Sequence, residues 1–234
     1  MNFIAGDETT YSQVLLVNKP ISWTSFDVVN KLRYTITKKV GTRLKVGHAG
    51  TLDPLASGLL IICTGKMTKE IDSYSGMNKE YTGTFFLGAT TPTYDSEMDP
   101  DAFFTIEHIT PQMLHETCSK FIGAQMQMPP IYSAIKVDGK TAYAQARKGK
   151  DIELKPRPIE ILEFELTRIE LPEVDFRVLC SKGTYIRSLA FDFGRALNSG
   201  AYLKKLTRTK IGSFRLENAH ELSELVNQIQ LPNS

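Results

Sequence analysis

The chain has 234 residues, of which 41% are hydrophobic and 23% charged, and this composition is ordinary for a globular protein with one sizeable core. The longest apolar stretch, residues 59–63, is far too short to cross a bilayer, and residues 1–12 have neither the basic leader nor the apolar core of a signal peptide. The three cysteines are too widely spaced for a zinc site, and without an export signal we expect a cytoplasmic protein.

The net charge of +2 conceals segments of opposite charge. Residues 31–45 and 204–215 hold six and five basic residues and no acidic one, and residues 136–157 hold seven basic and three acidic residues. Residues 95–116 hold six acidic residues and no Lys or Arg. This segregation favours a surface that attracts a polyanion, although charges scattered over a solvated surface would give the same counts.

The predicted elements mix strands and helices without strict alternation. Strands are predicted over residues 13–17, 59–63, 79–87, 159–169 and 174–180, and helices over residues 25–36, 111–121, 185–197 and 223–229. Ser25 is the predicted N-cap of the first helix, and Thr110-Pro111 opens the second with proline at its first position. The pattern predicts an α+β fold with a central mixed or mostly antiparallel sheet flanked by helices.

One domain is expected over residues 13–234, after an N-terminal tail of residues 1–12. Residues 126–150 are rich in Pro, Gly and Lys, and we expect them to form a mobile hairpin-and-helix excursion from the body of this domain.

The segment Gly-His-Ala-Gly-Thr-Leu-Asp-Pro-Leu-Ala-Ser-Gly, residues 47–58, is the densest cluster of unusual residues. Three glycines and a proline predict a loop whose shape the backbone dictates, and the apolar strand at residues 59–63 would hold it rigidly. Asp53 is its only carboxylate, and Pro54 biases Asp53 towards an extended backbone. From the residues alone, Asp53 is either a catalytic carboxylate or a turn residue whose side chain accepts a backbone hydrogen bond.

This segment resembles the catalytic loop of the TruB family, the bacterial tRNA pseudouridine-55 synthases, which reads Gly-His-x-Gly-x-Leu-Asp-Pro-x-Ala-x-Gly. Further segments resemble other elements of that family in the same order: residues 19–25, 79–81, 130–147, 180–187 and 206–208. Ile21 and Ser22 depart from the pattern, because the family usually has glycine at the position of Ser22. The resemblance implies a pseudouridine synthase fold, with residues 126–150 as an RNA-gripping thumb and no C-terminal PUA domain.

The resemblance also implies the roles of individual residues. Asp53 would be the essential carboxylate, Arg187 would pair with it and keep it ionised, and Tyr81 would stack on the target uracil and could act as a base at a sugar carbon. The other residues implied at the bound uridine are His48, Tyr185 and Leu206. The residues expected to contact the RNA backbone are Lys136, Lys140, Arg147, Lys148 and Arg208.

The implied activity isomerises uridine 55 in the T loop of tRNA by breaking the N1–C1′ bond and rejoining C5 to C1′. This rearrangement needs no redox change or transferred group, so we expect neither a cofactor nor a metal, and the chain has no phosphate-cradling glycine motif. The expected partner is the T arm of tRNA, with no membrane involved, and the protein is expected to be a monomer.

Two other functions fit part of the pattern. A non-catalytic RNA-binding or RNA-folding module would use the basic segments without needing the set Asp53, Tyr81 and Arg187. A carbohydrate-active enzyme would usually need two carboxylates, and Asp53 is the only one that stands in a motif.

Overall fold

The computed structural model describes residues 11–137, 139–149 and 152–231, and the chain forms two compact units. One unit comprises Met1–Tyr81 with Thr207–Ser234, and the other comprises Thr82–Leu206. The first ten residues of the expected N-terminal tail lie outside the described residues. Tyr11 is buried, and the Ser12 hydroxyl accepts a hydrogen bond from the Lys66 N–H, so the end of the expected tail is already packed on the first unit.

The first unit is built on a sheet with the strand order β14-β1-β3-β12, in which β2 also pairs with β3 and β13 with β12. Its strands are β1 (Val14–Lys19), β2 (Val46–Ala49), β3 (Ala56–Thr64), β13 (Phe214–Arg215), β14 (His220–Glu221) and the end of β12 (Ala201–Ile211). β1 and β3 are antiparallel, whereas β14 runs parallel to β1. The sheet of this unit is therefore mixed.

The helices of the first unit are α1 (Ser25–Val40), α2 (Ile71–Gly76), α6 (Leu222–Gln230) and the short 3-10 helices η1 (Gly65–Glu70) and η2 (Leu216–Asn218). The apolar face of α1, with Val28, Leu32 and Ile36, is buried in one core with Leu225 of α6 and Leu60 of β3. Contact between this face and the sheet explains the 3.6-residue spacing of these side chains.

The N-cap of α1 is Thr24, one residue before the predicted Ser25. The Thr24 hydroxyl accepts a hydrogen bond from the Asp27 N–H at 3.0 Å, and the Asp27 carboxylate accepts one from the Thr24 N–H at 2.9 Å. This reciprocal pair is a capping box. The Ser25 hydroxyl is left available for another contact, described below.

The second unit contains the strand order β12-β4-β11-β10-β7. Its further elements are the part of β4 (Lys79–Leu87) that follows Tyr81, β5 (Ala89–Thr90), β6 (Ala102–Phe103), α3 (Pro111–Phe121), β7 (Gly123–Gln127), β10 (Arg157–Glu170), β11 (Glu173–Cys180) and α5 (Ile186–Ala196). β10 is antiparallel to both β11 and β7. Aromatic side chains fill the core, with the rings of Phe85 and Phe176 stacked at 4.1 Å and Phe193 of α5 at 5.5 Å from Phe85.

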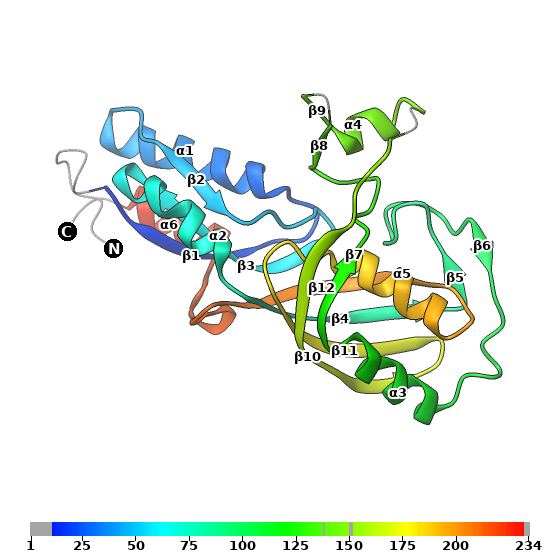
Figure 1. Ribbon diagram of the computed structural model, residues 1–234. Helices are drawn as coiled ribbons and strands as arrows, with labels where there is room; N and C mark the ends of the chain where they lie inside the picture. Colours follow the sequence, from blue (N-terminus) through cyan, green and yellow to red (C-terminus); the bar gives the residue numbers. More distant parts are fainter. Residues whose placement is uncertain (1–10, 138, 150–151, 232–234) are drawn as a thin grey trace. The chain divides into compact units, whose positions relative to one another are not determined.

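A small excursion leaves the second unit between β7 and β10. It consists of the hairpin β8 (Lys136–Val137) and β9 (Lys140–Thr141), followed by α4 (Ala142–Ala146), and Figure 1 shows these elements standing away from the sheet of their unit. Residues 138, 150 and 151 of this region lie outside the described residues. We call residues 128–149 the thumb segment.

The predicted fold class is confirmed, since strands and helices mix as expected and the sheets are mixed or antiparallel. The predicted loop at residues 47–58 is wrong in extent, because residues 46–49 form β2 and β3 begins at Ala56. The loop proper is residues 50–55. No helix among the described residues is long and apolar enough to span a membrane.

Candidate active site

Asp53 lies in the short loop between β2 and β3 of the first unit, where it is half-buried. The residue before it is fixed by the Ser25 hydroxyl, which accepts a hydrogen bond from the Leu52 N–H at 2.8 Å and donates one to the Leu52 carbonyl at 3.1 Å. The Ala56 N–H donates to the Asp53 carbonyl at 3.1 Å. The loop backbone is thus held immediately before and after the carboxylate.

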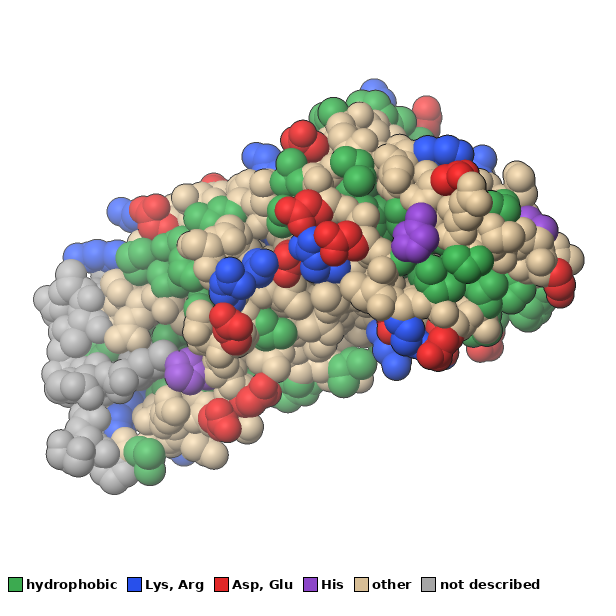
Figure 2. Space-filling model, turned by 90° about the horizontal axis from the view of Figure 1, so that it is seen from below, with side chains coloured by type: hydrophobic (Ala, Val, Ile, Leu, Met, Phe, Trp, Pro, Cys, Tyr) green, Lys and Arg blue, Asp and Glu red, His purple; other side chains and the backbone are tan. Residues whose placement is uncertain are grey.

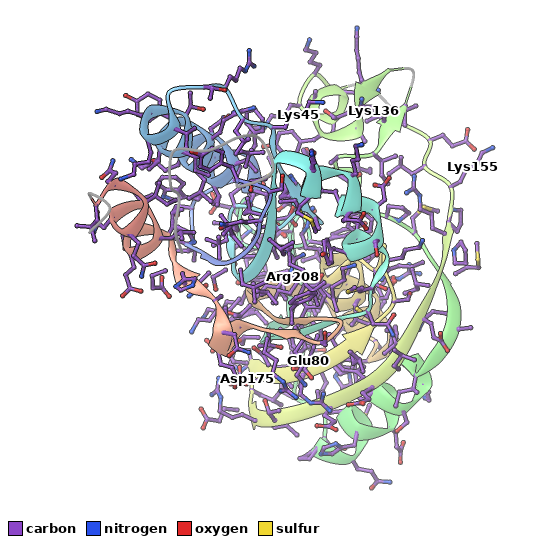
Figure 3. All side chains as sticks on the ribbon, turned by 90° about the vertical axis from the view of Figure 1, so that its left-hand side faces the viewer. Lys45, Glu80, Lys136, Lys155, Asp175 and Arg208 are labelled. Carbon is purple, nitrogen blue, oxygen red and sulfur yellow. The ribbon has the colours of Figure 1, made fainter. Side chains whose placement is uncertain are left out.

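Arg208 of β12 holds the start of the same loop from inside the unit, with a side chain that is 1% exposed (Figure 3). Its guanidinium donates to the carbonyls of Leu59 at 2.8 Å, Gly50 at 3.1 Å and Thr51 at 3.4 Å. A contact with the RNA backbone, expected from the sequence, does not fit this position, because the planar fork of donors is already directed at protein carbonyls. We assign Arg208 to the support of the loop.

Gly58 explains how Arg208 comes so close to β3. It has a φ of 107°, and a Cβ added there would lie 2.4 Å from the Arg208 carbonyl oxygen. Both the left-handed backbone and the close approach of β12 require glycine at this position.

Lys19, at the end of β1, holds the other side of the loop and is fully buried. Its ammonium donates to the carbonyls of Trp23 at 2.6 Å, Pro20 at 3.0 Å and Pro54 at 3.4 Å. Burial lowers the pKa of Lys19 to about 8, against the opposing effect of the nearby Asp53. The sequence analysis placed Lys19 in a motif without giving it a role; the only signal was a lysine followed by proline before a helix start.

Tyr81 and His48 lie in the same unit as Asp53. Tyr81, on β4, is 8% exposed, and its neighbour Glu80 accepts hydrogen bonds from Lys210 and Thr209, each at 2.8 Å. His48, on β2, is partly buried, and this burial together with the charge of Arg208 lowers the pKa of its imidazole. Both effects favour the neutral form of His48.

Arg187 lies in the second unit, in the first turn of α5, and only 5% of its surface is exposed. The guanidinium donates to the carbonyls of Tyr132 at 2.9 Å and Thr93 at 3.2 Å, and its Nε lies 3.6 Å from Oδ2 of the buried Asp95. Asp95 is a residue that sequence reasoning missed, because it is the first of six acidic residues in a segment interpreted only as a charged loop. A buried carboxylate partner for a cation at a helix N-terminus is the arrangement expected on electrostatic grounds.

The other predicted substrate residues of the second unit are Tyr185 and Leu206, and both are half-buried. The Gln127 side chain accepts a hydrogen bond from the Tyr185 N–H at 2.8 Å and donates one to the Tyr185 carbonyl at 3.0 Å. This amide fixes the backbone at Tyr185, immediately before the first turn of α5 that carries Arg187. Arg187 and Asp53 belong to different units, and their pairing remains a proposal.

The thumb segment exposes Lys136, Lys140, Arg147 and Lys148, and Lys136 is labelled in Figure 3. Its helix also contacts the acidic segment of the same unit. The Tyr143 hydroxyl donates to the Glu97 carboxylate at 2.8 Å, and the Arg147 guanidinium lies 3.2 Å from the same oxygen. Glu97 thus occupies two side chains that could otherwise meet an RNA phosphate.

Basic side chains are also gathered in the first unit around a cavity of about 560 Å³, lined by Arg33, Arg43, Lys45, Gly47 and Ile71 among others. The sequence identifies residues 31–45 as a basic segment, but nothing in its pattern assigns Arg33, Arg43 or Lys45 to a site. On the face shown in Figure 2, by contrast, basic and acidic side chains lie next to one another in several places. Among the described residues no cluster of His, Cys, Asp and Glu could hold a metal ion.

Ser22 provides a test of how the loop is supported, because it has the left-handed φ of 68° and its N–H donates to the Pro54 carbonyl at 2.8 Å. A non-glycine residue in this conformation costs roughly 1–2 kcal/mol, and glycine loses about 0.5–1 kcal/mol more backbone entropy on folding. We expect Ser22→Gly to raise the free energy of unfolding by up to about 1 kcal/mol in urea titrations. Ser223→Gly, on the exposed face of α6, should lower it; equal losses in both variants would contradict the strain at Ser22.

Lys19 provides a pH test. Its pKa of about 8 in the folded protein lies below the ordinary value of 10.5, so between these pH values the unfolded chain binds more protons than the folded one. The contribution of Lys19 to the free energy of unfolding must therefore rise with pH over this window. In urea titrations at pH 7.5 and 9.5 the stability of the wild type relative to Lys19→Met should increase. Lys31→Met, on the exposed face of α1, should show no such change, and a pH-independent difference for Lys19→Met would refute the shift.

Comparison with known proteins identifies the family to which the chain belongs. Residues 37–186 match the family described as TruB family pseudouridylate synthase (N terminal domain). The tRNA pseudouridine synthase B of Flavobacterium johnsoniae is 55% identical over 96% of this chain and 99% of its own length, and that of Phocaeicola vulgatus is 51% identical over 97% and 100%.

A solved structure, the crystal structure of a Cbf5-Nop10-Gar1 complex, contains a chain that is 29% identical, with a TM-score of 0.69 over 92% of this chain. This protein spans 53% of that longer chain. The family match over residues 37–186, together with relatives more than half identical along nearly the whole chain, shows that this protein belongs to the TruB family of pseudouridylate synthases.

Proposed function

We propose that this protein isomerises a uridine of tRNA to pseudouridine, with Asp53 as the essential carboxylate. The observation that carries the proposal is the loop of residues 50–55, in which two buried cations and one buried hydroxyl hold the backbone on both sides of Asp53. The relatives named tRNA pseudouridine synthase B supply the reaction and the class of substrate.

The reaction breaks the N1–C1′ bond of the uridine, turns the uracil and rejoins C5 to C1′. A carboxylate beside C1′ or C6 can act as a nucleophile or stabilise positive charge that develops on the sugar. Either role needs a carboxylate whose position varies little, since a displacement of about 1 Å can cost a hundredfold in rate. The hydrogen bonds to Leu52 and Pro54, the two neighbours of Asp53, supply this rigidity.

Arg187 is proposed to pair with Asp53 and to keep it ionised, as a neighbouring guanidinium does for a carboxylate. Support comes from the fixed orientation of Arg187, which is held by two carbonyls and by Asp95. Asp95 is therefore proposed as a positioning residue.

Tyr81 is proposed to stack on the target uracil, with Tyr185 and Leu206 lining the base pocket and the neutral His48 contacting the RNA. The base must leave its stack, at a cost of a few kcal/mol, and stacking on an aromatic side chain returns about 1–3 kcal/mol.

The proposed target is uridine 55 in the T loop, where unpaired bases are open to recognition. The exposed cations of the thumb segment, Lys136, Lys140, Arg147 and Lys148, are proposed to contact the RNA backbone, together with Arg33, Arg43 and Lys45 around the basic cavity. We further propose that the enzyme works as a monomer in the cytoplasm and without a cofactor, since the rearrangement needs no external group.

The first test replaces the carboxylate. Asp53→Asn keeps the shape of the side chain and removes its charge, so we expect kcat on an unmodified tRNA transcript to fall by at least about a thousandfold, or about 4 kcal/mol of transition-state stabilisation. RNA binding should be retained. Pseudouridine is measured at single-nucleotide resolution, and affinity by filter binding.

Asp72→Asn is the matched control, because Asp72 is an exposed residue of α2 and its replacement removes the same charge. Turnover by Asp53→Asn would mean that another carboxylate is essential. Binding without turnover in the wild type would instead identify an RNA-folding module on this fold.

The contact between Glu97 and the thumb segment gives a second test. The Glu97 carboxylate accepts the hydrogen bonds of Arg147 and Tyr143 that an RNA phosphate would otherwise accept. Removing its charge in Glu97→Gln should therefore tighten tRNA binding. The pair is largely exposed, and such pairs are worth about 0–1 kcal/mol, so the expected gain is up to about fivefold in Kd.

The gain should disappear in an Arg147→Met background and should be smaller for Asp99→Asn, which removes a charge from the same acidic segment. An equal gain with and without Arg147 would show that Glu97 acts only through the overall charge.

A further inference from the structure

Tyr94 has an unusual backbone conformation for a bulky side chain. Its φ is 62°, and it is one of three non-glycine residues in the described chain with a positive φ. Only glycine, and to a lesser degree Asn and Asp, adopts this conformation without appreciable cost. Something in the fold must therefore keep Tyr94 in place.

The two residues that flank Tyr94 both act on Arg187. The Thr93 carbonyl accepts a hydrogen bond from the Arg187 guanidinium at 3.2 Å, and the Asp95 carboxylate lies 3.6 Å from its Nε. All three are buried. The left-handed turn at Tyr94 is thus the point in the chain at which a main-chain oxygen and a side-chain carboxylate are directed to one guanidinium.

The ring of Tyr94 ties this turn to the helix that carries Arg187. It stacks on Phe191 with the ring centroids 4.2 Å apart and the planes within 16° of parallel. Phe191 follows Arg187 by four residues on α5, so the two side chains lie on the same face of the helix. Residues 91–95 therefore contact α5 in two ways: Thr93 and Asp95 contact Arg187, and the ring of Tyr94 stacks on Phe191.

The backbone of the segment has its own hydrogen bonds, from the Tyr94 N–H to the Thr91 carbonyl at 3.1 Å and from the Leu203 N–H to the Tyr94 carbonyl at 2.9 Å. These bonds maintain the turn within the loop and against β12. They do not attach the segment to α5; the ring stack and the contacts of Thr93 and Asp95 with Arg187 do.

We infer that Tyr94 is a positioning residue for the reaction: by stacking on Phe191 it keeps Thr93 and Asp95 on Arg187 and so fixes the guanidinium of the active site. This inference rests on the proposed function of Arg187. It concerns the orientation of a catalytic group, so it predicts a loss of kcat, whereas a ring that only fills space would affect stability alone.

The experiment compares three substitutions of Tyr94 by steady-state and single-turnover kinetics on tRNA. Tyr94→Val removes the ring and places a β-branched residue at a left-handed position, and we expect kcat to fall about tenfold or more while the KM for tRNA stays within about twofold. Tyr94→Phe keeps the stack and should retain wild-type kcat. Tyr94→Gly keeps the turn without the stack and should be intermediate.

Two controls separate positioning from stability. Tyr202→Val disrupts another stacked pair of the same unit, Tyr202 on Phe86 at 5.2 Å, and should lower Tm without lowering kcat. Should Tyr94→Val fail to fold, Phe191→Leu removes the stacking partner from a helical position that tolerates leucine, and the same loss of kcat is expected there. Wild-type kcat in the folded ring-deleted variant, or an equal loss in Tyr94→Phe, would overturn the inference.

Arg187→Lys, measured in parallel, separates this inference from the proposed function. If Arg187→Lys is inactive and Tyr94→Val has wild-type kcat, the inference fails and the proposed function stands. If Arg187→Lys retains wild-type kcat, the proposed role of Arg187 fails, and the inference fails with it.

Discussion

The hydrogen bonds from the Arg208 guanidinium to the carbonyls of Gly50, Thr51 and Leu59 are the interaction on which the position of the Asp53 loop depends. A buried cation is costly unless its donors are satisfied, and the loop between β2 and β3 supplies the acceptors. The loop in turn gains a fixed shape from the cation. Arg208 and the Asp53 loop therefore require each other, and Gly58 allows the approach.

Lys19 and Arg187 are held in the same way as Arg208, by backbone carbonyls. Carbonyl dipoles fix the direction of a buried cation without neutralising its charge, whereas a carboxylate partner would do both. For Lys19 and Arg208 the result is a positively charged support for the loop that carries Asp53, the proposed catalytic carboxylate. Arg187 differs because the Asp95 carboxylate lies beside it. The positive charge of Arg187 is therefore partly balanced by Asp95 before any substrate or second carboxylate binds to it.

The fold class, the helices α1, α3, α5 and α6 and the strands β1, β3, β4, β10 and β11 could be predicted from the sequence, because hydrophobic spacing and glycine or proline content act locally. The sequence analysis did not predict β12, and it did not reveal that Arg208 on this strand is buried. An arginine in a basic segment is usually exposed, and only the pairing of strands far apart in the chain places Gly58 and Leu59 next to it. Asp95 was missed for a related reason, since its partner is 92 positions away and nothing in an acidic segment distinguishes the buried member.

Ser22 and Tyr94 show a further limit of sequence reasoning, because each adopts a left-handed backbone that its residue type disfavours. In both, the neighbouring groups act on the site: the Ser22 N–H holds Pro54, and the residues beside Tyr94 hold Arg187. Strain of this kind persists only where surrounding contacts outweigh it. Such strain is therefore expected where the chain must direct particular atoms at a functional group. Ser22 lies beside the loop that carries Asp53 and Tyr94 lies beside the contacts of Arg187, so the fold gives up some stability to hold these two side chains in position.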